Sequence, residues 1–214
     1  VNNVFNDIKI LNYNFDLEKG ESQVDGFIKI GKELGFSYIQ TLSAYNEALV
    51  KFKKENQKKI SINDKKLESD KLKILVAAHP YNLHDALIGQ PIIDYLKQEN
   101  ISVLTSDIYD DYSKFDCKEI SKTIYWTYNK RINAAILKYK DFIDGIILLS
   151  TFPCGPDSLC NELIIRKIKS VPILYITKDD SSSDAGLITR LESFIDIIKL
   201  KKQREQVINE NNNN

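Results

Sequence analysis

From Lys71 onward, short apolar runs alternate with longer amphipathic segments, and this alternation limits the possible folds more than any other feature. Runs typical of buried strands span 73–78, 101–105, 143–149 and 172–177. Apolar residues recur at helical spacing over 88–99, 119–140, 158–169 and 187–200. Strands and helices in such a series form parallel sheets covered on both faces, because parallel strands need a crossover connection. The sequence therefore predicts a doubly wound α/β domain over residues 71–203, with a mostly parallel four-stranded sheet of the flavodoxin- or Rossmann-like kind.

Residues 1–70 lack proline and predict a helical segment that precedes this domain. Apolar residues recur at helical spacing from Glu21 to about Lys54, and Gly35 is expected to separate two helices. Residues 51–70 are rich in lysine and form either an anion-binding strip or a solvated linker. Carboxylates interleave with these lysines, which favours the charged linker. The Asn-rich end predicts a disordered tail over 204–214.

The composition excludes several classes of protein. Basic and acidic residues both number 30, so the chain lacks the positive charge expected of a nucleic-acid binder. No apolar run approaches the ~20 residues that span a bilayer, and no signal peptide opens the sequence. Three cysteines do not suit a secreted disulfide scaffold. We therefore expect a cytoplasmic protein without a membrane partner. Because the sequence contains no methionine, we also expect that it begins inside a longer sequence or that its start has been trimmed.

Ligands of open parallel sheets bind beyond the carboxyl ends of the strands, so the residues there are the first candidates for a site. The four expected strand ends carry residues 79–82, 107–111, 151–158 and 178–180. Cys154 stands out, because it lies between Pro153 and Gly155 in a rigid turn, with Asp157 or Ser158 expected as the N-cap of the next helix. A helix N-terminus favours the thiolate, which either attacks an electrophile or binds a soft metal. The alternative is a buried cysteine in a loop.

The remaining candidates are weaker. We expect Cys160 to pack in the core and Cys117 to have no specific role. His79 and His84, five residues apart, are a weak zinc pair, and His79 fits better as a hydrogen-bonding residue at a strand end. Arg190 could reach the crevice beside Cys154 or pair with a carboxylate. Neither a G-x-G-x-x-G turn nor a P-loop lysine motif is present, which argues against dinucleotide and P-loop nucleotide binding.

Four segments, in order, resemble proteins related to the 2-hydroxyacyl-CoA dehydratase components and their activase-associated relatives. These segments are 79–89 (HPYNLHDALIG), Tyr125-Trp126 with the helix after it, 144–158 (DGIILLSTFPCGPDS) and 186–194 (GLITRLESF). The resemblance implies two similar α/β domains and a [4Fe–4S] cluster held by three cysteines. It also implies an ATP-dependent activase that supplies a low-potential electron for chemistry on an acyl-CoA. Cys154 matches the cysteine of the family's C-terminal domain and would be a cluster ligand, which suits a soft thiolate. The surrounding cofactor or substrate pocket would include His79, Tyr81, Gly155, Asp157, Ser158, Thr189 and Arg190.

The sequence departs from the family in its other cysteines, because Cys117 and Cys160 do not match the remaining ligands. The resemblance thus implies a C-terminal domain whose missing N-terminal half carries the further ligands, so that this chain alone has no cluster and no dehydratase activity. One alternative is an accessory domain that docks a partner without redox chemistry. Another is a thiol enzyme with Cys154 as nucleophile and His79 as base.

Overall fold

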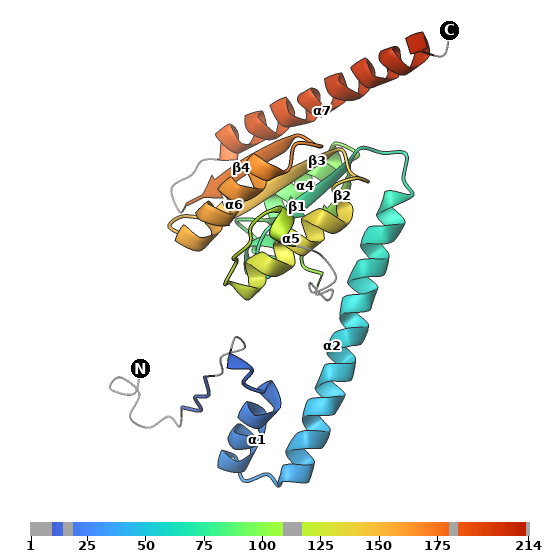
Figure 1. The fold of residues 1–214 in the computed structure, drawn as a ribbon. Coiled ribbons are helices and arrows are strands. Elements are labelled where there is room, and N and C mark those ends of the chain that lie inside the picture. Colours follow the sequence, from blue (N-terminus) through green and yellow to red (C-terminus); the bar gives the residue numbers. More distant parts are fainter. Residues whose placement is uncertain (1–9, 15–18, 109–116, 180–183, 213–214) are drawn as a thin grey trace. The chain divides into compact units, whose positions relative to one another are not determined.

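The computed structural model describes residues 10–14, 19–108, 117–179 and 184–212 (Figure 1). The chain divides into two compact units, Val1–Gln57 and Lys58–Asn214. The boundary falls inside a long helix, so the last turns of that helix belong to the second unit. None of the helices described here is long and apolar enough to cross a membrane.

The first unit contains helix α1 (Gln23–Glu33) and the first part of helix α2 (Tyr38–Leu67). Gly35 adopts a φ of 87° between them, a conformation that glycine tolerates best, so the predicted break is confirmed. Ser37 and Gln40 begin α2 with a capping box: the Gln40 N–H donates to Ser37 Oγ (3.3 Å) and the Ser37 N–H donates to Gln40 Oε1 (2.9 Å). Sequence-local hydrogen bonds therefore fix where α2 starts.

The second unit is built on a four-stranded parallel sheet, as the sequence predicts. Its strands lie in the order β2-β1-β3-β4. They are β1 (Lys73–Ala77), β2 (Ser102–Thr105), β3 (Gly145–Thr151) and β4 (Ile173–Lys178). The residues of β1 and β3 are nearly all buried, because helices cover both faces of the sheet.

Two helices cover each face of the sheet. One face packs against α4 (Gln90–Gln98) and α7 (Asp184–Asn212), and the other against α5 (Thr127–Tyr139) and α6 (Gly155–Lys167). Alternate residues of β1 show the division, since Ile74 and Val76 belong to the first core and Leu75 and Ala77 to the second. The prediction of a doubly wound α/β fold is therefore confirmed. Two short elements, α3 (Pro80–Leu83) and η3 (Cys117–Glu119), complete the described structure.

The end of α2 protects the edge strand β2, which would otherwise expose free backbone groups. The Asn63 side-chain amide donates to the Thr105 carbonyl (2.8 Å) and accepts from the Thr105 N–H (3.4 Å), as a neighbouring strand would. Lys66 Nζ donates to the Val103 carbonyl (2.5 Å), and Ser102 Oγ donates to the Lys66 carbonyl (3.1 Å). The charged segment predicted as a linker is thus helical as far as Leu67, and its last turns belong to the α/β unit.

Two helices differ in length from the prediction. Helix α5 begins at Thr127 rather than Glu119, although Ile120 and Ile124 are buried. The Ser121 hydroxyl donates to the Thr123 carbonyl (3.3 Å), a local bond that competes with helix formation there. Helix α7 continues to Asn212, so the described part of the predicted disordered tail is helical. Strong helix formers such as lysine, glutamine and glutamate extend it past the apolar pattern.

Candidate functional site

The strongest candidate site lies where the carboxyl ends of β1 and β3 meet. These two strands are neighbours, but the chain leaves β1 toward β2 and later returns to β3 on the other side. Ligands of doubly wound sheets bind at such a switch point. His79 directly follows β1, and Cys154 and Asp157 follow β3, so the topology brings together residues about 75 positions apart in the sequence.

His79 and Asp157 form a buried hydrogen-bonded pair at this point. Nε2–H of His79 donates to Asp157 Oδ1 over 2.7 Å, and the two side chains are only 9% and 5% exposed. Asp157 is not the N-cap of α6 that the sequence predicts. Cys154 is the N-cap and α6 begins at Gly155, because Pro156 suits the first helical turn. The carboxylate therefore lies in that first turn, where the helix dipole favours negative charge.

Helix α5 supplies a third member of the site. Asn129 Nδ2 donates to the same Asp157 oxygen over 3.1 Å. Burial opposes the charged form of Asp157, but the hydrogen bonds from His79 and Asn129 outweigh it and lower the carboxyl pKa. His79, Asn129, Cys154 and Asp157 form what we call the switch-point cluster. Asp157 remains a carboxylate within it.

Two polar atoms of the switch-point cluster, Nδ1 of His79 and Oδ2 of Asp157, are buried without a hydrogen-bond partner. Among the described residues, side-chain atoms of Asn82 and Asn133 are also buried and unbonded. Most buried polar groups in native proteins are bonded, so a local excess of unbonded ones is typical of a strained or functional site. The His79 ring also stacks on Tyr81 at 5.0 Å and meets the edge of Tyr128 at 5.3 Å.

Cys154 does not have the favoured thiolate that the sequence predicts. Burial raises the pKa of its thiol first, and the Asp157 carboxylate raises it further, against a hydrogen bond from the Asp157 backbone that lowers it. Burial, together with the carboxylate in the first turn of α6, therefore outweighs the effect of the helix N-terminus. Cys154 is half-buried and reaches the rim of the switch point, whereas Cys160 lies in the core, where burial raises its pKa to about 11.

The structure separates the other predicted site residues. Ser158 Oγ and the Ser158 N–H both bond the Cys154 carbonyl, at 2.8 and 3.1 Å, which fixes the backbone of the cysteine. Gly155 is exposed, with open space where a side chain would lie. Arg190 donates to the backbone carbonyl of Tyr175 on the edge strand β4, and no carboxylate partner for it is found among the described residues. The carbonyl of Thr189, on the same helix, accepts the hydroxyl of Ser193 (2.8 Å).

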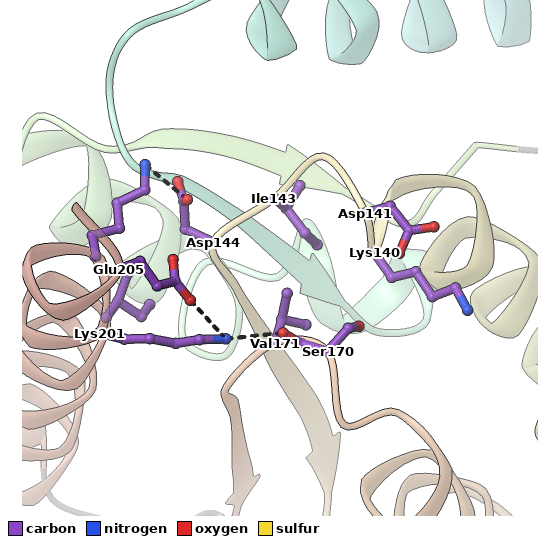
Figure 2. A pocket seen from close by; sticks show the side chains of 10 residues that line it. Lys140, Asp141, Ile143, Asp144, Ser170, Val171, Lys201 and Glu205 are labelled. Atoms are coloured by element: carbon purple, nitrogen blue, oxygen red, sulfur yellow. Dashed lines mark hydrogen bonds and ion pairs between the residues drawn. The ribbon is translucent and has the colours of Figure 1, made fainter. Parts of the chain in front are cut away.

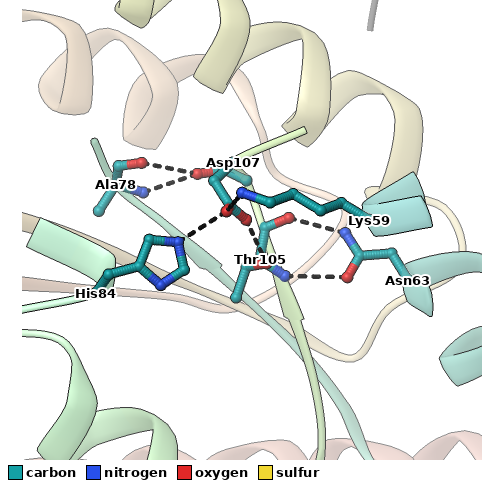
Figure 3. A network of polar contacts seen from close by, with 7 residues as sticks. Lys59, Asn63, Ala78, His84, Thr105 and Asp107 are labelled. Carbon is teal, nitrogen blue, oxygen red and sulfur yellow. Dashed lines mark hydrogen bonds and ion pairs between the residues drawn. The ribbon is translucent and has the colours of Figure 1, made fainter. Parts of the chain in front are cut away.

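A second polar network lies at the carboxyl end of β2 (Figure 3). Asp107 accepts from the Lys59 ammonium, from His84 Nε2 (2.9 Å) and from Thr105 Oγ1 (2.7 Å). We call these four residues the Asp107 network. Burial opposes the charge of Asp107, but the three donors lower its carboxyl pKa. Residues 109–111, part of the same predicted strand end, and Asp180 lie outside the described residues.

The opposite edge of the sheet carries a pocket of about 270 Å³ in which charges are paired (Figure 2). Lys202 lies 2.8 Å from Asp144, and Lys201 bonds the Ser170 carbonyl at 2.9 Å and lies 3.8 Å from Glu205. Side chains of α7 and of the loops before β3 and β4 thus neutralise one another. The contacts across the pocket hold these elements together, and the paired side chains leave little net charge that could attract a ligand.

Sequence reasoning missed Asn129 and Lys59. Asn129 and Asn133 lie on the apolar face of α5, three residues before Ile132 and Ile136 respectively, and polar residues at such positions are a signal of a buried network. Lys59 gave no comparable signal, because it is one of several lysines in the charged segment. Among the described residues, no group of three or more His, Cys, Asp or Glu side chains is placed to hold a metal ion.

Comparison with known proteins gives one match. A family model described as a CoA enzyme activase uncharacterised domain (DUF2229) matches residues 1–108, about half of the chain. The matched region contains the helical segment, β1, β2, His79 and the Asp107 network. No curated protein and no solved structure matches the chain.

Proposed function

The chain belongs to this family of CoA enzyme activase-related domains, and on this premise we propose that its α/β unit contributes one ligand, Cys154, to a [4Fe–4S] cluster. The other ligands would come from cysteines outside these 214 residues, and an ATP-dependent activase would be the electron donor. When bound, the cluster supplies low-potential electron transfer to an acyl-CoA-type substrate. The isolated chain would then hold no cluster and have no activity of its own.

The observation that carries this proposal is the position of Cys154 at the switch point. It is half-buried at the N-terminus of α6, at the sheet edge where doubly wound proteins bind ligands. Cys160 is 2% exposed, and Cys117 is the first residue of η3, with its thiol donating to the Lys130 carbonyl at 3.8 Å. Cys154 is therefore the best placed of the three thiols for a shared group.

The donor set fits a role as a single ligand. A thiolate is the preferred ligand of iron–sulfur clusters, and one thiolate cannot hold a cluster alone. The raised pKa of Cys154 means that its thiol is protonated in the free chain, and metal binding would displace that proton. Ser158 holds the cysteine backbone in place, and His79 with Asn129 fixes the neighbouring carboxylate.

Aromatic side chains around the switch point favour a second candidate function, the docking of a partner without redox chemistry. Tyr81, Tyr128 and Phe152 are 61%, 44% and 71% exposed, and the two tyrosines contact the His79 ring. Large exposed aromatic residues are enriched at protein interfaces. The thiol-enzyme alternative has less support, because the second ring nitrogen of His79 has no bonded partner among the described residues, so it does not contact the Cys154 thiol as a base would. Burial and the Asp157 carboxylate also raise the pKa of that thiol.

The test is the iron and acid-labile sulfide content of the longest native form of the protein, prepared anaerobically. Cys154→Ala is compared with Cys117→Ala, a second half-buried thiol, and with Cys160→Ala. Iron that is lost only with Cys154→Ala supports the ligand role. Iron that is absent from the unaltered protein, or unchanged in Cys154→Ala, contradicts it and favours the docking function.

A further inference from the structure

A cavity of about 480 Å³ lies beside the edge strand β2, on the far side of that strand from β1. Its walls come from the last turns of α2, from the end of α4 and from the start of β2. This volume is within the range of sites for small organic ligands, roughly 300–1,000 Å³. Its described lining contains neither Cys154 nor any other residue of the switch-point cluster.

Among the described residues, the lining of the cavity contains four lysines and no carboxylate. Lys65 and Lys66 come from α2, Lys71 from the connection to β1 and Lys97 from the last turn of α4. Within the part of the chain that the structure describes, Lys97 alone among them has an ion pair, with exposed Asp94 at 3.3 Å. Two helix C-termini lie here and together offset about one positive charge. A net positive charge therefore remains in the cavity.

The lysines also repel one another in the absence of a ligand. Burial lowers the pKa of Lys66, and the positive charge of Lys97 lowers it further, while the Asp107 carboxylate acts in the opposite direction. Lys66 keeps its position through its bond to the Val103 carbonyl. An anion in the cavity would relieve the repulsion between Lys66 and Lys97.

The cavity has an apolar side as well. Ile62 lines it and is 54% exposed, which is unusual for a large aliphatic side chain beside a sheet, and Ile101 and Val103 lie beneath. The lining thus combines positive charge with apolar surface, in contrast to the charge-paired pocket of Figure 2. Lysine carries a compact charge suited to phosphate, and it lacks the planar fork with which arginine binds carboxylates.

We propose that this cavity binds a small organic phosphate, with the phosphate held by Lys65, Lys71 and Lys97 and its apolar body lying on Ile62. The site does not depend on Cys154 or on a cluster, so it stands or fails separately from the proposed function. The charged segment that the sequence left as a strip or a linker would then have a binding role at its helical end.

The test is titration calorimetry of the full 214-residue chain at low salt. The probe is adenosine 3′,5′-bisphosphate, the phosphate-bearing end of coenzyme A, with inorganic phosphate and adenosine titrated separately. The bisphosphate should bind more tightly than either of the other two. The double variant Lys65→Gln/Lys97→Gln should weaken it by about tenfold or more, since charge-assisted hydrogen bonds are lost. Both lysines are exposed, so the variant should fold, which circular dichroism checks.

Two further variants sharpen the result. Ile62→Gln should weaken the bisphosphate severalfold and leave the affinity for inorganic phosphate unchanged, because only the apolar contact is removed. Lys167→Gln removes an exposed lysine from the last turn of α6 and should leave all affinities unchanged. The proposed site would be overturned if the bisphosphate did not bind, or if it bound no more tightly than inorganic phosphate. It would also be overturned if Lys167→Gln lost as much affinity for the bisphosphate as the double variant.

Discussion

Two histidine–aspartate pairs lie at the same edge of the sheet and differ in how completely they are bonded. Their histidines, His79 and His84, are five residues apart in one connection, and their aspartates follow different strands. Asp107 uses both oxygens, with three donors that include an ammonium. Asp157 uses one oxygen for two donors, and its other oxygen is buried without a partner.

The two pairs also differ in how exposed their imidazoles are, and the pair with the incompletely bonded aspartate is the more buried one. The His79 side chain is 9% exposed, whereas that of His84 is 59% exposed. A buried, incompletely bonded pair costs stability and is kept where a site needs it, while a fully bonded carboxylate stabilises the fold. We infer that the Asp107 network stabilises the packing of the last turns of α2 against β2 and the loop after β1. We infer that the switch-point cluster is instead kept for a functional role.

The largest effect is expected for Asp107→Ala. The substitution leaves the Lys59 ammonium, the Thr105 hydroxyl and the His84 imidazole without their shared acceptor. Because solvent reaches the ammonium and the imidazole, the substitution should lower the free energy of unfolding by about 3 kcal/mol. Urea titration followed by the fluorescence of Trp126, the one tryptophan, measures this. Asp141→Ala, at an exposed carboxylate, should cost less than about 0.5 kcal/mol. A loss at Asp107 as small as this control would remove the stabilising role of the network.

Lowering the pH should weaken both histidine–aspartate pairs and so reduce the free energy of unfolding, by less than Asp107→Ala does. The pKa values of Asp107 and Asp157 are both lowered on folding. Below the unfolded-state pKa of about 4, the unfolded chain binds protons that the folded chain does not. Stability is therefore complete above that pH and falls as the pH drops through the lower folded values. Asp107→Asn should make the fall shallower in urea titrations between about pH 4 and pH 2.5, and an unchanged slope would contradict the assignment.

Much of the fold could be predicted because each strand of the sheet has a sequence pattern that is recognisable over a few consecutive residues. Runs such as 73–78 and 143–149 are buried on both faces and keep their strand signal whatever surrounds them. The ends of α5 and α7 were harder, because buried Ile120 and Ile124 mimic helical spacing, and the extension of α7 depends on helix formers without an apolar face.

The candidate site was predicted only in part, because its geometry depends on which strands are neighbours. His79, Cys154 and Asp157 are strand-end residues that the alternation of strands and helices already indicates. Their meeting follows from the order β2-β1-β3-β4, which the sequence alone does not state. The raised pKa of Cys154 could not be predicted either, since it depends on where the Asp157 carboxylate points.

Truncation of His79 should have an intermediate effect. His79→Ala removes the shorter of the two nitrogen-donor hydrogen bonds to Asp157 and leaves a buried carboxylate with the Asn129 amide and the neighbouring Cys154 thiol. The expected loss is about 2 kcal/mol in the free energy of unfolding. His79→Gln, which retains a donor, should recover part of it. If His79→Ala were neutral, the buried pair would have no net bonding energy, and its unbonded atoms would fully offset its hydrogen bonds.

The smallest effect is expected for His84→Ala, at about 0.5 kcal/mol. Its imidazole is 59% exposed, so solvent weakens the interaction with Asp107, which keeps Lys59 and Thr105 as donors. The same urea titration measures it, and a double-mutant cycle with Asp107→Asn isolates the pair itself. A cost equal to that of His79→Ala would mean that exposure does not separate the two pairs. In that case the loop after β1 would hold both aspartates with equal strength, and the distinction between a stabilising network and a functional cluster would depend on Cys154 alone.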